Sequence, residues 1–278
     1  MNICFYNVQL SVGRKCFNIM SLEKINIIRY ENGEIKEFRD QVVEEKPLTI
    51  FINDYEIATL LCTPKDLKSL IIGFLASEGL IEDIKNISNI KFDYQNTVAK
   101  VDINKKVRLN LLGKRTLTSG CGGGITFTSI KDCAESKTIY SSIRVKPDTI
   151  LNLMQELHSS SAMFKKTGGT HSAALAQKNQ LVITAEDIGR HNALDKIIGK
   201  SLIEDLSFED KIILTSGRLS SEMVLKVLKR GIPILISRAA PTRMAIEMAT
   251  EKGLTLVGFT RGKRMNIYTK SQRIKFEN

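Results

Sequence analysis

One cysteine of this 278-residue chain lies in an unusual setting. Cys121 stands in the stretch TSGCGGGIT (118–126), with one glycine before it and three after it. Glycine destabilises regular elements, so such a run marks either a functional loop or a linker. Backbone N–H groups in a glycine-rich turn favour a thiolate, and the glycines remove steric bulk around the sulfur. The pattern favours a reactive thiol on an exposed loop, with a plain flexible linker as the alternative.

The other cysteines do not form a recognisable site. Cys4, Cys16, Cys62 and Cys133 are scattered, the total is odd, and no CxxC pair occurs. The N-terminal stretch lacks a basic segment and a small-residue cleavage site, so we do not expect it to be a signal peptide. These features predict reduced thiols in a cytoplasmic protein and no structural zinc site made of cysteines.

Two stretches contain the polar residues that a binding site requires. TGGTHSAAL (167–175) carries His171 after a glycine pair, and EDIGRHNALDK (186–196) carries Asp187, Arg190, His191 and Asn192. The second stretch is expected at a strand-to-helix turn, where polar groups can meet a ligand. Both histidines can equally be hydrogen-bonded structural residues.

Three junctions between predicted elements are suited to anions. TSGR (215–218) and SRAAPTR (237–243) each place small residues, hydroxyls and an arginine before a helix. FTRGKR (259–264) follows a strand and groups three basic residues around a glycine. Each junction alone could be a capped helix or a solvated turn, but together they favour a large phosphorylated ligand. The third comprises Phe259, Thr260, Arg261, Gly262, Lys263 and Arg264.

The composition restricts the partners. Lysine and arginine number 41 against 30 acidic residues, giving a formal net charge of +11 that favours a polyanionic partner. Charge is the only support for nucleic acid, because tryptophan is absent and no basic run is interleaved with aromatic residues. No apolar run of about 18 residues occurs, so we expect no membrane span.

The elements that must position these residues alternate regularly in the second half. A helix is predicted over 146–161, with Leu151, Met154, Leu157 and His158 on one face. Two strands within 171–187 follow, and strand–helix repetition then predicts a largely parallel sheet covered by helices. The expected segments are helices 190–203, 220–231 and 242–253 and strands 211–216, 233–237 and 254–260.

The first half has a different pattern. Residues 1–22 form an extension of uncertain order, and 23–115 predict a small α+β region. Its strands are expected over 25–30, 34–38, 46–54, 90–95, 98–103 and 106–112. A helix is predicted from Pro64, with Thr63 as its N-cap and Gly79 at its end. A glycine-rich active-site loop, 116–130, separates this region from an α/β domain over 145–278.

Several long motifs in this order resemble the FdhD family of formate dehydrogenase accessory proteins. They are GGTHSAAL, EDIGRHNALDK, LTSGRLSSEM, SRAAPT and GFTRGKR, preceded by KPLTIFINDYEIATLLCTPKDLKSLIIGFLASEGLI, and the likeness runs from about residue 23 to 273. It implies a mixed α/β sheet flanked by helices and similar to cytidine deaminases, with a smaller α+β N-terminal region, in a homodimer.

The resemblance also implies a function. The chain would be a cytoplasmic sulfurtransferase of molybdenum cofactor biosynthesis that accepts a cysteine persulfide from a cysteine desulfurase. Cys121 would carry the sulfur to bis-molybdopterin guanine dinucleotide, which formate dehydrogenase needs, and 259–264 would bind that cofactor. Many members have a CxxC in the loop, whereas Cys121 here is followed by three glycines. A resolving thiol in the loop is therefore absent, and a one-cysteine relay remains.

Other functions make different demands. A zinc deaminase on the same fold needs a PCxxC ligand pair and a glutamate beside the histidine ligand, and the chain has neither at His171. We therefore expect no protein-held metal. A cofactor-binding chaperone that moves no sulfur would share every anion-binding feature and differ only in not needing Cys121.

Overall fold

The computed structural model describes residues 22–93, 95, 97–104, 116–117, 125–126 and 138–276. Cys121 and most of the predicted loop lie outside these residues, as do 1–21 and the strand expected over 106–112. Two short strands on either side of position 121, β7 (Thr116–Leu117) and β8 (Ile125–Thr126), pair antiparallel.

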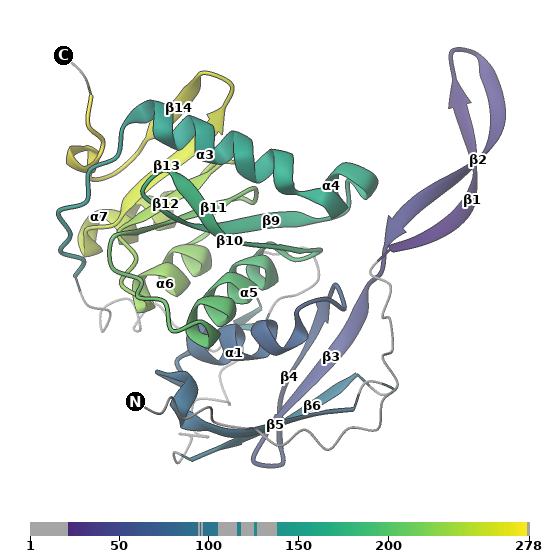
Figure 1. Ribbon diagram of the computed structural model, residues 1–278, viewed down its shortest axis with the longest axis horizontal. Coiled ribbons are helices and arrows are strands. Elements are labelled where there is room, and N and C mark those ends of the chain that lie inside the picture. The colour runs from purple at the N-terminus through teal and green to yellow at the C-terminus, as the bar shows by residue number, and fades with distance from the viewer. Residues whose placement is uncertain are drawn as a thin grey trace, which may run out of the picture.

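A six-stranded sheet in the order β10-β9-β11-β12-β13-β14 forms the centre of the larger part (Figure 1). The three strands of the predicted strand–helix repeat, β11, β12 and β13, run parallel as expected, but the whole sheet is mixed rather than largely parallel. The reason is that β9–β10 and β13–β14 are hairpins, whose short turns allow only antiparallel pairing. The strands are β9 (His171–Gln177), β10 (Gln180–Asp187), β11 (Lys211–Thr215), β12 (Ile234–Ser237), β13 (Thr255–Arg261) and β14 (Arg264–Ile267).

Helices cover both faces of this sheet, and the strand pleat divides its side chains between them. Ile213 and Leu235 belong to the core shared with α5 (Arg190–Ile203), α6 (Ser221–Lys229) and α7 (Arg243–Lys252). Their neighbours Ile212 and Ile234 pack toward α3 (Pro147–Ser160) on the opposite face. A short helix, α4 (Ala162–Thr167), follows α3, and a 3₁₀ turn, η3 (Ser271–Arg273), lies near the C-terminus. The predicted helices and strands of this half are confirmed to within a few residues.

The buried face of α3 differs slightly from the prediction. Ile150, Leu153, Met154 and Leu157 are buried, whereas His158 is exposed at the margin of that face. The imidazole is therefore accessible to the space between α3 and the ends of the strands.

The smaller part is a four-stranded sheet in the order β4-β3-β6-β5 with one helix against it. The sequence did not predict β4, which pairs antiparallel with β3 across a short turn. The elements are β3 (Lys46–Ile52), β4 (Tyr55–Cys62), α1 (Leu67–Glu78), η1 (Ile84–Asn86), β5 (Ile87–Asp93) and β6 (Val98–Ile103).

Helix α1 begins at Leu67, so the prediction of a start at Pro64 with Thr63 as N-cap is wrong. Thr63 is fully buried, and its hydroxyl accepts the N–H of Ile188 at 3.1 Å instead of capping the helix. A tertiary contact thus outweighs the local capping signal. The predicted end is confirmed, because Gly79 has φ +79° and closes the helix through the Ala76 carbonyl.

The two parts share one core through the crossing of α1 and α5. A Cβ on Gly73 would lie 1.7 Å from the Asp195 carbonyl oxygen, and one on Gly199 would lie 1.9 Å from the Ser69 oxygen. Only glycine permits the two helix backbones to approach so closely. The buried cluster around this crossing runs from Leu48 of β3 to Leu256 of β13.

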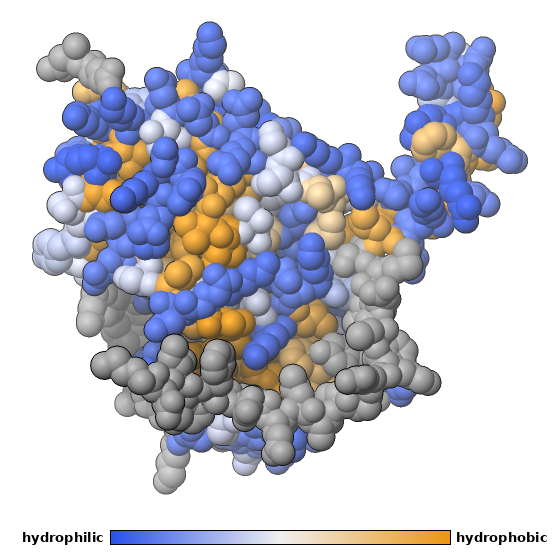
Figure 2. Space-filling model, viewed as in Figure 1, coloured by the Kyte–Doolittle hydropathy of each residue, from blue (hydrophilic) through white to orange (hydrophobic). Residues whose placement is uncertain are grey.

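A long hairpin extends away from both parts (Figure 1). Its strands, β1 (Leu22–Glu31) and β2 (Glu34–Val43), pair over their whole length and turn at Asn32 and Gly33, which both have positive φ. We call this hairpin the arm. Hydrophilic residues dominate its visible surface with apolar ones among them (Figure 2), and Ile28, Tyr30 and Ile35 are more than 70% exposed. No helix among the described residues is long and apolar enough to cross a lipid bilayer.

Candidate functional site

The three anion-suited junctions lie side by side at one edge of the larger sheet. Because β11, β12 and β13 are parallel, the segments that follow them emerge at the same edge, where ligands gather in such sheets. The Arg238 N–H donates to the Thr215 carbonyl at 3.2 Å, and the Phe259 N–H donates to the Ala239 carbonyl at 3.1 Å. The sequence prediction thus grouped segments that are true neighbours.

The segment 259–264 spans the turn between β13 and β14: it comprises the last three residues of β13, then Gly262 and Lys263, and the first residue of β14. We call this whole segment the turn 259–264. Gly262 has φ +60° at the turn, and Arg261, Lys263 and Arg264 are exposed around it. Phe259 has φ 51°, which is rare for a bulky residue, and it lies where the pairing of β13 with β14 is irregular between Gly258 and Arg261. Thr260 is fully buried, yet its hydroxyl has no hydrogen-bond partner among the described residues. The turn therefore combines exposed cations with an unsatisfied buried hydroxyl.

Internal hydrogen bonds fix the other two junctions. The Ser237 hydroxyl donates to the Gly217 carbonyl at 2.6 Å and accepts the Ala239 N–H at 2.9 Å. The Gly217 N–H in turn donates to the Thr215 hydroxyl at 3.2 Å. Both loops are thereby held in one conformation, which is the preorganisation that a binding site needs.

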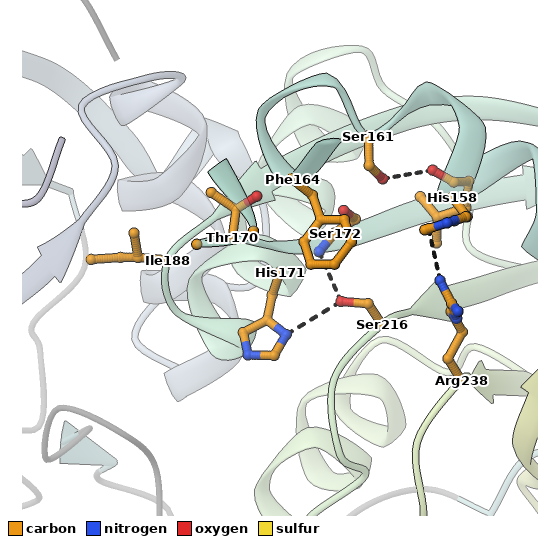
Figure 3. Close-up of a pocket in the computed structure, with 12 residues that line it drawn as sticks. His158, Ser161, Phe164, Thr170, His171, Ser172, Ile188, Ser216 and Arg238 are labelled. Atoms are coloured by element: carbon orange, nitrogen blue, oxygen red, sulfur yellow. Dashed lines mark hydrogen bonds between the residues drawn. The ribbon is translucent and has the colours of Figure 1, made fainter. Parts of the chain in front are cut away.

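A cavity of about 400 Å³ lies between α3–α4 and these strand ends (Figure 3). We call it the strand-end cavity. Two of the chain's three histidines line it, each in contact with a residue of a strand-end junction. Arg238 donates from Nη1 to Nδ1 of His158 at 2.7 Å, and Nδ1 of His171 lies 3.3 Å from the Ser216 hydroxyl. The complete lining is Leu157, His158, Ser161, Phe164, Gly168, Gly169, Thr170, His171, Ser172, Ile188, Ser216 and Arg238.

Both imidazoles favour the neutral form. Burial lowers the pKa of His171 below 6.5, and the positive charges of Arg190 and His191 lower it further, against a smaller opposing effect of Asp187. The pKa of His158 is also lowered, by desolvation first and then by Arg238 and Lys165. Neutral rings can accept hydrogen bonds at Nδ1, which agrees with the partners found there.

The motif EDIGRHNALDK serves mainly to join the two parts of the molecule. Asp187 and Lys196 form a fully buried ion pair of 2.6 Å. Asp187 also accepts the backbone N–H of Thr63 at 3.2 Å, and Asn192 donates both to Asp187 and to the Leu61 carbonyl. Asp187 and Asn192 are thus committed to structure, and the expectation that they face a ligand is wrong for both.

His191 likewise has a structural partner. Its Nε2 lies 3.0 Å from a carboxylate oxygen of Glu222 in the first turn of α6. This contact links the N-terminal ends of α5 and α6. The two atoms are close enough for an ion pair but do not form a hydrogen bond, so the alternative of a hydrogen-bonded structural histidine stays a prediction for His191. His171 lines the strand-end cavity.

Cys62 is unsuited to thiol chemistry. It is fully buried, and its surroundings raise the pKa of the thiol to about 12, through burial first and then the negative charge of Asp187. The thiolate is the reactive form, so this sulfur is inert near neutral pH. Cys121, Cys4, Cys16 and Cys133 lie outside the described residues.

No group of three or more histidine, cysteine, aspartate or glutamate side chains is arranged to hold a metal ion within the part of the chain that the structure describes. The groups that are present suit an anion rather than a metal ion. Fixed loops, cations and neutral imidazoles lie together at the end of the sheet where β11, β12 and β13 finish.

Comparison with known proteins agrees with this organisation. The model of the FdhD/NarQ family matches residues 43–275, which is most of the chain. The chain belongs to this family. Among its relatives, Sulfur carrier protein FdhD of Bacillus licheniformis is 42% identical over 261 residues, covering 93% of this chain and 98% of that protein. The protein of the same name from Bacillus pumilus is 44% identical over 257 residues, covering 91% and 98%.

A solved structure supports the fold. It is the crystal structure of a Desulfotalea psychrophila protein assigned as a formate dehydrogenase accessory protein. The likeness has a TM-score of 0.76 and 27% sequence identity, and it covers 91% of this chain and 99% of the other. The mixed sheet and its helices are therefore the architecture of this FdhD/NarQ chain.

Sequence reasoning and structure differ most at the strand-end cavity. The contact of His158 with Arg238 was not predicted, because His158 in α3 and Arg238, which follows β12, are 80 positions apart. A sequence signal did exist for Ser216 and Arg238, since both lie in predicted anion junctions. The sequence contained no signal that His171 would contact Ser216 or that His158 would contact Arg238.

Proposed function

We propose that this chain is a sulfur carrier for formate dehydrogenase maturation, with Cys121 as its acceptor. The observation that carries the proposal is the match, over nine-tenths of the chain, to proteins named sulfur carrier protein FdhD. The inert setting of Cys62 supports it by removing the one cysteine among the described residues as a candidate. The glycines around Cys121 supply the access that a carrier needs.

The donor in this proposal is a cysteine desulfurase that bears a persulfide. The Cys121 thiolate attacks the terminal sulfur, forms a new S–S bond and displaces the desulfurase thiolate. The acceptor is bis-molybdopterin guanine dinucleotide, which takes the zero-valent sulfur as a substrate of the carrier. The electron pair of the broken S–S bond remains on Cys121, and the thiolate is restored for another cycle.

The turn 259–264 is the proposed contact for that cofactor. Arg261, Lys263 and Arg264 are exposed cations suited to phosphate or pterin oxygens, and the Thr260 hydroxyl lacks a partner among the described residues. The mixed sheet with helices on both faces also supports, as part of the proposal, a likeness to the cytidine deaminase fold. We further propose a homodimer, since the cofactor has two pterin halves and a two-fold assembly offers two equivalent sites.

The central test is the Cys121→Ala variant. After incubation with a cysteine desulfurase and cysteine, mass spectrometry of the wild type should show one added sulfur on the peptide containing Cys121. The variant should fold, keep nucleotide binding and fail to restore formate dehydrogenase activity in a strain lacking the native protein. Cys62→Ala and Cys133→Ala are the controls and should retain activity.

A cofactor-holding chaperone without sulfur transfer is the competing function. It would be favoured if Cys121→Ala restored full formate dehydrogenase activity. The cofactor contact is tested separately by neutralising Arg261, Lys263 and Arg264 together and titrating GDP. Each charge-assisted hydrogen bond to a phosphate is worth about 1.5–3 kcal/mol, so unchanged affinity would exclude this turn. Light scattering with and without nucleotide tests the dimer, and a monomer at all micromolar concentrations would contradict it.

A further inference from the structure

The arm carries a large share of the exposed apolar side chains. Five of the twelve large apolar residues that are exposed in the described part of the chain lie on its 22 residues. They occupy both faces of the ribbon, because Ile27 lies opposite Phe38 on one face and Tyr30 lies opposite Ile35 on the other. Apolar exposure concentrated in this way marks an interaction surface. The five exposed residues are Ile25, Ile28, Tyr30, Ile35 and Phe38.

The arm meets the rest of its own chain at its base. Val43 lies there beside Gly169, so close that a Cβ added to the glycine would be 2.9 Å from a methyl carbon of the valine. We call the two larger sheets and their helices the body. Beyond the base the arm extends away from the body, with apolar side chains among the hydrophilic ones at its surface (Figures 1 and 2). Ile28, Tyr30 and Ile35 lie near its turn and are therefore open to another molecule.

The charge of the arm indicates what kind of molecule that is. Residues 22–43 include four basic and five acidic residues, a net charge of −1. Of the 41 basic and 30 acidic residues of the chain, 37 and 25 lie elsewhere, which leaves +12 for the rest. Nucleic acids and anionic lipids are attracted by positive charge, so the arm does not suit them. It suits a strongly basic protein surface, and a second copy of this chain provides one.

The size of the arm favours a symmetric contact between two copies. Stable protein interfaces use about 20–30 residues on each side. The 22 residues of one ribbon cannot all touch the same surface, so a single arm falls short of that size. In a two-fold pair, each chain contributes its own arm and the surface that receives the other arm, which doubles the contact. Exchange of an identical element is also a low-cost route to a dimer.

We propose that the arm binds the body of a second copy of this chain, and that two copies exchange arms about a two-fold axis. The apolar side chains near the turn of each arm pack against the partner, and the acidic residues of the arm face its basic surface. This inference rests on the homodimer of the proposed function and names the element that forms it. Sulfur loading of Cys121 does not depend on it.

The first test measures the dissociation constant of the dimer by light scattering of the full-length chain. Ile28→Lys combined with Ile35→Lys should raise the constant about tenfold or more, because both apolar side chains leave the interface. Tyr140→Lys is the matched control, since Tyr140 is 91% exposed and lies outside the arm. It should change the constant by less than about twofold. Circular dichroism establishes that each variant is folded.

The second test changes the charge of the arm in both directions. Glu31→Lys combined with Glu37→Lys moves its net charge from −1 to +3 and should weaken the dimer. Lys24→Glu combined with Arg39→Glu moves it to −5 and should leave the dimer as strong or make it stronger. The two variants alter the same number of arm residues, so the difference between them reports the sign of the charge.

The third test identifies the surface that receives the arm. Tyr30 is replaced by the photo-crosslinker p-benzoylphenylalanine, and ordinary chains are mixed with chains labelled with ¹⁵N. After irradiation, mass spectrometry should find peptide pairs that join the arm of one isotope to the body of the other.

Three results overturn the proposal. They are an unchanged dimer in the folded Ile28→Lys and Ile35→Lys variant, a dimer that is unchanged or stronger when the arm is made positive, and cross-links that join the arm only to its own chain or only to the other arm. A wild type that stays monomeric refutes the homodimer as well, whereas an unchanged dimer in the variant refutes only the role of the arm. Failure of sulfur loading on Cys121 refutes the carrier function and leaves these measurements unaffected.

Discussion

Two buried lysines that pair with aspartates show how single residues hold this molecule together. Lys196 of α5 pairs with Asp187 and also donates to the carbonyls of Thr63 and Glu186, both at 3.2 Å. Lys226 of α6 pairs with Asp195 of α5 at 2.6 Å. Burial is the largest effect on the pKa of Lys226 and acts to lower it, but the negative charges of Asp195 and Glu78 together outweigh burial and raise the pKa. Lys226 therefore keeps its charge because carboxylates beside it compensate it.

Removing one partner of the Asp187–Lys196 pair should be strongly destabilising. Lys196→Ala leaves a carboxylate uncompensated in a fully buried position, and we expect a loss of about 3–5 kcal/mol in the free energy of unfolding. Urea denaturation measures it. Lys200→Ala is the control on the same helix, because its pair with Asp66 is partly exposed and contributes less than about 1 kcal/mol. Equal losses in the two variants would contradict the structural role of Lys196.

The histidines of the strand-end cavity predict a pH dependence. The folded-state pKa of His171 lies below its ordinary value of 6.5, because burial, Arg190 and His191 outweigh Asp187. The unfolded chain then binds more protons between the two pKa values, so this contribution to stability is present above pH 6.5 and is lost as the pH falls. NMR titration should place the midpoints of His158 and His171 below 6.5. A midpoint above 6.5 for His171 would show that the ring is not in the environment described.

At the scale of elements, local sequence patterns were sufficient to predict the bounds of those helices and strands that depend mainly on their own residues. The helix expected over 190–203 has the observed bounds, and the hairpin within 171–187 is confirmed. The start of α1 could not be read, because Thr63 is bonded to Ile188, 125 positions away. The pairs His171–Ser216 and His158–Arg238 span 45 and 80 positions, and periodicity contains no information at that range.

The crossing of α1 and α5 gives a prediction about these elements. Gly73→Ala should gain about 1 kcal/mol in helix propensity but places a methyl group where the Asp195 carbonyl oxygen lies, 1.7 Å away. The backbone cannot move aside as a flexible side chain would, so the clash outweighs the gain in helix propensity and the variant is destabilised. We expect a net loss above about 2 kcal/mol in the free energy of unfolding. Lys68→Ala, on the exposed side of α1, should stay within about 0.5 kcal/mol of the wild type.

At the scale of the whole molecule, the two parts are one thermodynamic unit. The buried cluster that includes α1 and α5 contains side chains from both sheets, and Asp187, Lys196 and Thr63 bridge the same boundary. The arm is the exception, because a two-stranded hairpin with exposed Ile28 and Tyr30 adds little stability of its own.

We therefore expect a single unfolding transition outside the arm. The chain has no tryptophan, so one can be introduced as a local probe at Phe92 in the small sheet or at Tyr268 beside the large one. Both probes should report the same urea midpoint and the same slope as circular dichroism. Separate midpoints for the two tryptophans would show that the parts unfold independently.

The shared core has a consequence for the segment between residues 104 and 139, which contains Cys121 and connects the two parts. The chain leaves the small sheet at Asn104, whose N–H donates to the Asn86 carbonyl, and is anchored again at Ile139, whose N–H donates to the Lys252 carbonyl. Among the described residues, the parts are held together by the glycine crossing of α1 and α5 and by the hydrogen bonds of Asp187, Asn192 and Lys196 to Thr63 and Leu61. The two parts therefore resemble two subunits of a complex that are joined in one polypeptide chain. A backbone cut between these positions would leave a nicked protein whose halves stay associated, and separately synthesised halves could reassemble.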